Sequence, residues 1–328
     1  MRRTIMNTLG WACVALAAAS CSEDFAPYNR LEGLRVLAVQ SEPVSPAFGQ
    51  TTTLSPLVFA PADEIVTYAW SWCPVAGPAN QGSPCLVQES QLAQILGPEA
   101  AAQLPPFNLG TEPTATFTNN IPAAILAMLC NNETASGFSV FSCTNGFPIQ
   151  IKMVATSSKA GVVTDTVTTV RTLDLAYDPA ALPNTNPQIS GLTGQQLKKD
   201  SDDPEAEPQS LTTDGLAIAF RQRAMRLRAV VPLASAEPSI DRNERGEPVP
   251  SQERLFISWF IDAGTTDDER TGFIAGKTKL EDATTTDWRP AIAKKYPGTQ
   301  SKVVAVIRDN RGGVAWTWGL VTLVEAPQ

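Results

Sequence analysis

The residues best suited to do chemistry in this 328-residue chain are its six cysteines, because the chain contains no histidine. Without histidine there is no Ser-His-Asp triad, no Cys–His pair and no histidine-ligated metal. No two cysteines form the C-x-x-C pair that is typical of zinc sites. The chemistry expected of cysteines in this chain is therefore acylation and disulfide formation, and the six cysteines are Cys13, Cys21, Cys73, Cys85, Cys130 and Cys143.

Cys21 follows a segment that reads as an export signal. Two arginines near the start precede about fifteen mostly apolar residues, 5–19, which are too few for the ~20 of a membrane span. The residues LAAAS directly before Cys21 resemble the lipobox of bacterial lipoproteins, and this resemblance implies removal of residues 1–20 and acylation of the new first residue. Ordinary cleavage after Ala19 is the alternative.

Acylation of Cys21 leaves an even number of cysteines, because Cys13 departs with the signal. An even number suits an exported protein in an oxidising compartment. Four cysteines allow three pairings, and loops rich in Gly, Pro and Asn favour the local one: Cys73 with Cys85, and Cys130 with Cys143. Each bridge is expected to stabilise the fold by about 3 kcal/mol through restriction of the unfolded chain.

The charged residues include a basic cluster within an acidic chain. Lys and Arg number 25 and Asp and Glu number 33, so the net charge is −8 and nucleic acid is not an expected partner. Arg226 and Arg228 share one face of a predicted strand. We expect them to pair with acids across the sheet, and contact with an anionic surface polymer is the alternative.

Two acidic loops are weak candidates for calcium. Asp241 and Asn243 match the start of a calcium loop, and Asp262 and Asp267 belong to a second acidic stretch. The first loop has arginine at its fifth position and no glutamate at its twelfth, so a plain turn is favoured there. No other metal or cofactor is expected. A glycoside hydrolase that uses carboxylates alone is a remote alternative, because nothing places two of them in one cleft.

Two tryptophans mark the last predicted strand. Trp316 and Trp318 are two residues apart and therefore share one face of that strand. Packing into a core is the first interpretation of this pair, and an aromatic platform for carbohydrate is the second.

The elements that must position these residues are strands, arranged in two copies. Residues 65–73 alternate, with Trp70 and Trp72 on one face, and residues 255–261 repeat this strand with Trp259. Each copy ends in a hairpin, at 149–173 and 303–324. The pattern predicts an all-β chain of two tandem antiparallel Ig-like β-sandwiches.

The expected organisation includes an insertion in the first copy. Residues 74–147 separate its tryptophan strand from its final hairpin, contain helical spacing at 88–104 and 121–129, and include or border all four mature cysteines. We expect a partly helical, disulfide-stapled insertion that suits binding. The remaining boundaries are a signal at 1–20, a tether at 21–33, a first sandwich at 34–175, a linker at 176–186 and a second sandwich at 187–326.

Several of these motifs carry a family resemblance. VVAVIRDNRGGVAWTW resembles the last hairpin of PKD-like and Ig-like domains, and YAWSWC and ISWFIDAG resemble their tryptophan strand. With the lipobox-like sequence at Cys21, the chain resembles exported bacterial lipoproteins with tandem Ig-like domains. The resemblance implies acyl anchoring in the outer membrane, because Ser22 rather than Asp follows the cysteine. It leaves open whether the protein faces the periplasm or the cell surface.

The function expected from these observations is non-catalytic. We expect an envelope lipoprotein that presents its sandwich loops and its insertion to a protein or glycan partner. A structural spacer or an envelope-assembly subunit without a ligand is the alternative.

Overall fold

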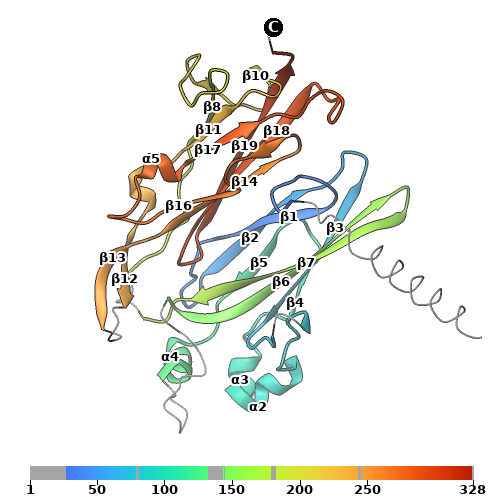
Figure 1. The fold of residues 1–328 in the computed structure, drawn as a ribbon. Helices are drawn as coiled ribbons and strands as arrows, with labels where there is room; N and C mark the ends of the chain where they lie inside the picture. The colour runs from blue at the N-terminus through green and yellow to red at the C-terminus, as the bar shows by residue number, and fades with distance from the viewer. Residues whose placement is uncertain are drawn as a thin grey trace, which may run out of the picture.

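The computed structural model describes residues 27–326 except 79–80, 132–142, 144, 179–181, 243–244 and 246. Two β-sandwiches lie side by side, with strands that run in similar directions (Figure 1). This arrangement confirms the predicted all-β class. The predicted signal at 1–20 and Cys21 lie outside the described residues. In the part of the chain that is described, no helix is both long enough and apolar enough to cross a membrane.

The first sandwich packs a three-stranded sheet on a four-stranded sheet. One sheet has the order β1 (Arg35–Glu42), β2 (Thr51–Phe59), β5 (Ala115–Thr118), and the other has the order β4 (Asn108–Gly110), β3 (Ile65–Cys73), β6 (Phe147–Lys159), β7 (Val162–Leu175). In β6 every second side chain is buried, as expected for a strand with one face on a core. The tryptophan strand β3 lies next to it and buries Trp70 and Trp72.

The second sandwich packs two five-stranded sheets around Trp259 and Trp288. One sheet has the order β10 (Ala217–Phe220), β19 (Val314–Val324), β18 (Gln300–Asp309), β14 (Leu255–Ile261), β16 (Arg270–Phe273). The other has the order β15 (Thr265–Thr266), β17 (Thr285–Arg289), β11 (Met225–Val230), β8 (Gly191–Gln196), β9 (Gln209–Ser210). The pairing of β10 with β19 is parallel, a departure from the purely antiparallel prediction.

Several short elements decorate the sandwiches. The hairpin of β12 (Pro238–Arg242) and β13 (Pro248–Gln252) projects from the connection between β11 and β14 (Figure 1). The helices are η2 (Glu89–Gln91), α2 (Leu92–Leu96), α3 (Pro98–Ala101), α4 (Ala123–Asn131), η3 (Leu233–Ser235) and α5 (Leu280–Ala283). Four of these segments, η2, α2, α3 and α4, lie in or overlap residues 88–104 and 121–129, where helical spacing was found.

The structure corrects the prediction that residues 74–147 are an insertion, because part of this segment belongs to the sheets of the first sandwich. It contributes β4 and β5, one strand to each sheet. The rings of Phe107 and Phe117 pack edge-on against Trp72, and Leu126 of α4 is fully buried in the same core. Strands of three and four residues are too short to show an alternating pattern in the sequence, which is why they were missed.

A third apolar core joins the two sandwiches. Leu37 and Ala38 of β1 pack against Phe260 of β14 and against Val304 and Val306 of β18, and all five are buried. Strands β14 and β18 are therefore buried on both faces. Burial on both faces explains why these strands have continuous apolar runs, LFISWFI and VVAVI, instead of an alternating pattern. We call this contact surface the seam.

The expected tether at 21–33 is not free over its described part. Asn29 donates to Thr266 Oγ1 at 2.7 Å, and Arg30 donates to the carbonyls of Asp262 and Gly264 at 3.1 and 2.7 Å. Leu31 is buried in the third core. The segment from residue 29 is thus a docked edge of the second sandwich, because its apolar and hydrogen-bonding groups find partners there.

The expected linker at 176–186 is also bonded to both sandwiches. The side chain of Asn186 donates through Nδ2 to the Ser41 carbonyl at 2.9 Å, and its Oδ1 accepts from the backbone N–H of Val314 at 2.8 Å. Arg311, which is buried, donates to the carbonyls of Leu182 and Pro183 at 3.2 and 2.9 Å. The described part of the linker therefore holds the seam closed.

The seam predicts a measurable loss of stability on truncation. Phe260→Ala is expected to lower the free energy of unfolding by about 3–5 kcal/mol, because it empties a buried aromatic site between the sandwiches. Phe48→Ala, at an exposed ring in the first sandwich, is the control and should change it by less than about 0.5 kcal/mol. Urea unfolding followed by fluorescence measures both, and similar values for the two variants would contradict a stabilising seam.

Candidate functional site

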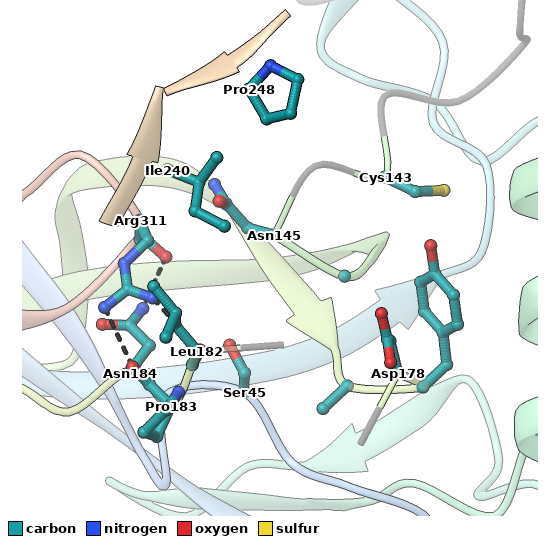
Figure 2. A pocket seen from close by; sticks show the side chains of 13 residues that line it. Ser45, Cys143, Asn145, Asp178, Leu182, Pro183, Asn184, Ile240, Pro248 and Arg311 are labelled. Carbon is teal, nitrogen blue, oxygen red and sulfur yellow. Dashed lines mark hydrogen bonds between the residues drawn. The ribbon is translucent and has the colours of Figure 1, made fainter. Parts of the chain in front are cut away.

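A cleft of about 420 Å³ opens where three parts of the chain meet beside the seam. Asn145 belongs to the first sandwich, Tyr177 and Leu182 to the linker, and Ile240 and Pro248 to the β12–β13 hairpin. Figure 2 shows Ile240 and Pro248 on one side of the space and Cys143 and Asp178 on another. The cleft therefore exists only because the two sandwiches are held together.

A disulfide fixes one wall of the cleft. Cys143 lines the cleft and is bonded to Cys130 of α4, while Cys73 is bonded to Cys85, which is the local pairing expected from the sequence. Cys130 and Cys143 both pack against the core of the first sandwich. The bridge thus connects the wall of the cleft to a packed interior.

The rim of the cleft exposes aliphatic side chains. Ile240 is 57% exposed and Leu182 is 42% exposed, although both are large and apolar. Pro183 and Pro248 extend this apolar rim. Exposed apolar residues that converge on one hollow with a few polar groups are typical of binding sites.

A buried ion pair forms the floor of the cleft. Arg311 Nε donates to Glu253 Oε1 at 2.5 Å, and its Nη2 donates to Glu237 Oε2 at 3.3 Å. Burial raises the pKa of Glu253, and the neighbouring Asp309 carboxylate raises it further. Asn184 donates to the Arg311 carbonyl at 2.9 Å, and its side-chain oxygen is buried with no hydrogen-bond partner in the structure. The floor is thus a network of hydrogen-bonded polar groups in which one acceptor, the Asn184 side-chain oxygen, has no partner.

A second carboxylate beside the cleft is strongly affected by burial. Asp174 on β7 lies next to Gly146, a residue of the cleft wall. Burial raises the pKa of Asp174 from 3.8 to about 6, and the positive charge of Arg171 offsets part of that effect. Arg171 itself is engaged with the Ser41 hydroxyl at 2.8 Å and with the Val39 and Gly312 carbonyls. Asp174 therefore titrates without a direct ion pair among the described residues.

The basic cluster lies on the far sheet of the second sandwich and is paired with acids. Arg226 makes a two-pronged contact with Asp287 at 2.8 and 2.9 Å, and Arg228 contacts Glu281 at 2.9 Å. The Arg226–Asp287 contact matches the first of the two interpretations, ion pairing across the sheet, whereas the partner of Arg228 lies on α5. The guanidinium groups are already occupied by carboxylates, so this surface is a poor site for an anionic polymer.

The calcium candidates are used as structural groups. Asp262 accepts from Ser301 Oγ and from the Lys302 amide, and Asp241 accepts from Arg254 at 2.8 Å. Asp267 is exposed near Asp287, and Asn243 lies outside the described residues. No group of three or more Cys, Asp or Glu side chains within the described ranges is arranged to hold a metal ion.

The two tryptophans of the last strand lie at the seam. Trp316 and Trp318 are half-buried and pack against the third core, and the Lys302 ammonium lies 4.4 Å from the Trp318 ring centroid. Their position agrees with packing, because β1 and β2 cover the face that a sugar would need.

The cleft itself was not foreseen from the sequence. The sequence marked the cysteines and the Pro/Asn-rich linker, but it gave no sign that the β12–β13 hairpin would lie beside them. The turn RDNRGG was the nearest signal, since its Arg311 proves to be buried and joins the linker to the second sandwich. Contacts between residues more than 120 positions apart leave no local pattern.

The solved structures compared below are distant from this chain in sequence. No protein-family model and no curated protein matches the chain. Among solved structures, the D00-D0 domain of intimin is 10% identical with a TM-score of 0.21, over 89% of this chain and 99% of that one. Murine CEACAM1b is 9% identical with a TM-score of 0.22, over 88% and 99%. Three N-terminal domains of the outer capsid protein Hoc of bacteriophage RB49 are 9% identical with a TM-score of 0.17, over 90% and 100%. All three scores lie well below 0.5, so these likenesses establish nothing about function.

Asp174 predicts a pH-dependent effect on stability. The pKa is higher in the folded state than in the unfolded chain, so the folded state binds the proton more tightly and stability from this group falls as the pH rises from about 4 to 6. Asp174→Asn is expected to raise the free energy of unfolding at pH 7, by an amount that shrinks toward pH 4.

Urea unfolding at several pH values measures this difference. Asp165→Asn, an exposed change on the same strand, is the matched control and should show no such trend. A variant at position 174 that is no more stable than the wild type at pH 7 would contradict the effect of burial.

Proposed function

We propose that this protein is a non-catalytic envelope lipoprotein, anchored through Cys21, that presents the cleft to a segment of a partner protein. The observation that carries the proposal is the convergence of a disulfide-fixed wall, an apolar hairpin and a docked linker on one hollow. Each of these elements is held by contacts that do not require a ligand.

Rigidity of the cleft supports binding. The third core and the Arg311 ion pairs hold the hairpin and the linker in place before any partner arrives. The free-energy cost of ordering the site when a partner binds is then smaller, which is the usual advantage of a pre-formed surface.

The chemistry of the rim favours a protein segment over a glycan. The apolar contacts come from Leu182, Pro183, Ile240 and Pro248, which suit aliphatic or aromatic side chains of a partner. Tyr177 is the one aromatic side chain among the described residues that line the cleft, whereas sugars bind best on broad aromatic platforms.

The carboxylates of the cleft support a non-catalytic role. Asp178 is the single carboxylate among the described lining residues, and Arg311 is bound to carboxylates that lie beneath. Hydrolysis of a glycoside needs two carboxyl groups facing one bond. The cleft is therefore better suited to binding than to hydrolysis.

Anchoring through Cys21 predicts a modified first residue. Mass spectrometry of the N-terminal peptide from native membranes should show acyl chains on Cys21, and Cys21→Ala should move the protein from the membrane fraction to the soluble envelope fraction. Protease treatment of intact cells reports in the same experiment which side the protein faces. An unmodified chain that starts at Ser20 would support ordinary cleavage and overturn the anchor.

Binding at the cleft predicts a position-specific crosslink. A photoreactive amino acid in place of Ile240 should yield one discrete adduct in intact cells, because this side chain stands on the rim. The same amino acid in place of Leu216, an exposed position in the second sandwich outside the cleft, is the matched control.

The disulfide offers a second control for the same experiment. Cys130→Ser with Cys143→Ser should weaken the adduct at position 240, because the cleft wall is no longer fixed. Equal adducts at positions 240 and 216, or none at either, would overturn the cleft as a binding site and leave the spacer as the better account.

A further inference from the structure

A second polar hollow lies on the outer face of the second sandwich, at the edge of the seam. Strand pairing places Ser258 opposite Arg270 and Phe256 opposite Arg308, so these four side chains share one face of β16, β14 and β18. With Tyr28 from the docked N-terminal segment they line a space of about 290 Å³. The first sandwich covers the neighbouring Phe260, whose ring lies 5.5 Å from that of Tyr28.

Both arginines in this hollow lack an acidic partner. No ion pair among the described residues includes Arg270 or Arg308, although the chain carries a net charge of −8. Arg308 donates to the Ser258 hydroxyl at 3.3 Å and to the Leu37 carbonyl. Arg270 lies over the Tyr28 ring, with its guanidinium carbon 5.5 Å from the centroid, and it donates to the phenol oxygen at 3.4 Å.

The remaining charges near the hollow do not neutralise these arginines. Asp309 lines the hollow, but its Oδ1 accepts from the Arg311 and Gly313 amides of the adjacent turn. Arg35 adds a third positive charge, because it donates to the Tyr28 carbonyl at 3.0 Å and forms no ion pair in the described structure. Burial lowers the pKa of Arg308, Tyr28 offsets part of that effect, and the positive charge of Arg270 lowers the pKa as well. An anion between the two guanidinium groups would relieve that repulsion.

We propose that Arg270 and Arg308, with the hydroxyl groups of Tyr28 and Ser258, form a binding site for a phosphate group. Each guanidinium can offer two parallel N–H donors, and the two hydroxyl groups add donors from other directions. This set exceeds what a planar carboxylate with two oxygens can accept and matches a tetrahedral group with more oxygens. Phe256 and Tyr28 supply an apolar wall for the ester substituent.

The source of the phosphate is either a lipid headgroup or a soluble phosphate ester, and the lipid source rests on the proposed anchor. Tyr28 lies seven positions after Cys21, and seven steps of the chain span at most about 25 Å when fully extended. Acylation at Cys21 would therefore keep the hollow within reach of a bilayer surface.

Binding of inorganic phosphate to the Cys21→Ala chain tests the site without any acyl chain. Saturable binding by calorimetry is expected, and Arg270→Gln should weaken it about tenfold or more, since one charge-assisted pair is lost. Tyr28→Phe should weaken it less. Arg289→Gln, at an exposed arginine that forms no ion pair in the described structure, removes the same charge and should leave binding unchanged. Arg308 is left intact because it also bonds to Leu37 across the seam.

Vesicles then distinguish the two sources. Cosedimentation of the Cys21→Ala chain with phosphatidylglycerol vesicles, but not with phosphatidylcholine vesicles, and its loss in Arg270→Gln would assign the site to lipid headgroups. Phosphate binding without cosedimentation would assign it to soluble phosphate esters. No phosphate binding, or equal weakening by Arg270→Gln and Arg289→Gln, would overturn the site. Neither result bears on Cys21 acylation or on the crosslink at position 240, so the proposals fail separately.

Discussion

The apolar contact between the two sandwiches is the interaction on which the rest of the molecule depends. Phe260, Val304 and Val306 present a second apolar face on strands that already bury their other face in a core. Leu37 and Ala38 cover that face. Removal of this much apolar surface from water favours one fixed arrangement of the sandwiches over a flexible chain of two domains. Both candidate sites lie at the margins of this contact.

Polar groups at the margin of the seam determine how the two sandwiches fit. Asn186 bonds to a backbone group of each sandwich, and Arg311 bonds to the linker and to Glu253, which is fully buried. An arginine can satisfy several buried acceptors at once, whereas apolar contacts alone are not directional. These bonds therefore give the seam its orientation, and the orientation brings the β12–β13 hairpin to the disulfide at Cys143.

The two hollows differ in the chemistry they offer, and the difference follows from what surrounds them. The cleft at Ile240 has an apolar rim above a floor in which charges are paired. The hollow at Arg270 has unpaired cations beside two hydroxyl groups. A protein segment suits the first and a phosphate suits the second. If Cys21 carries acyl chains, one protein would contact a partner and the membrane surface through two different hollows beside the same seam.

The sequence by itself determined the all-β class, the two tryptophan strands, the closing hairpins and the local disulfide pairing, because each of these depends on neighbours close in the chain. Alternation at Trp70 and Trp72 has a period of two, and each cysteine loop spans 12 or 13 residues. Only the tertiary structure decided that β4 and β5 belong to the first sandwich, that the linker is docked, and that Arg270 faces Arg308. These outcomes depend on contacts between distant segments, and short strands or single arginines carry no periodic signal of where they will pack.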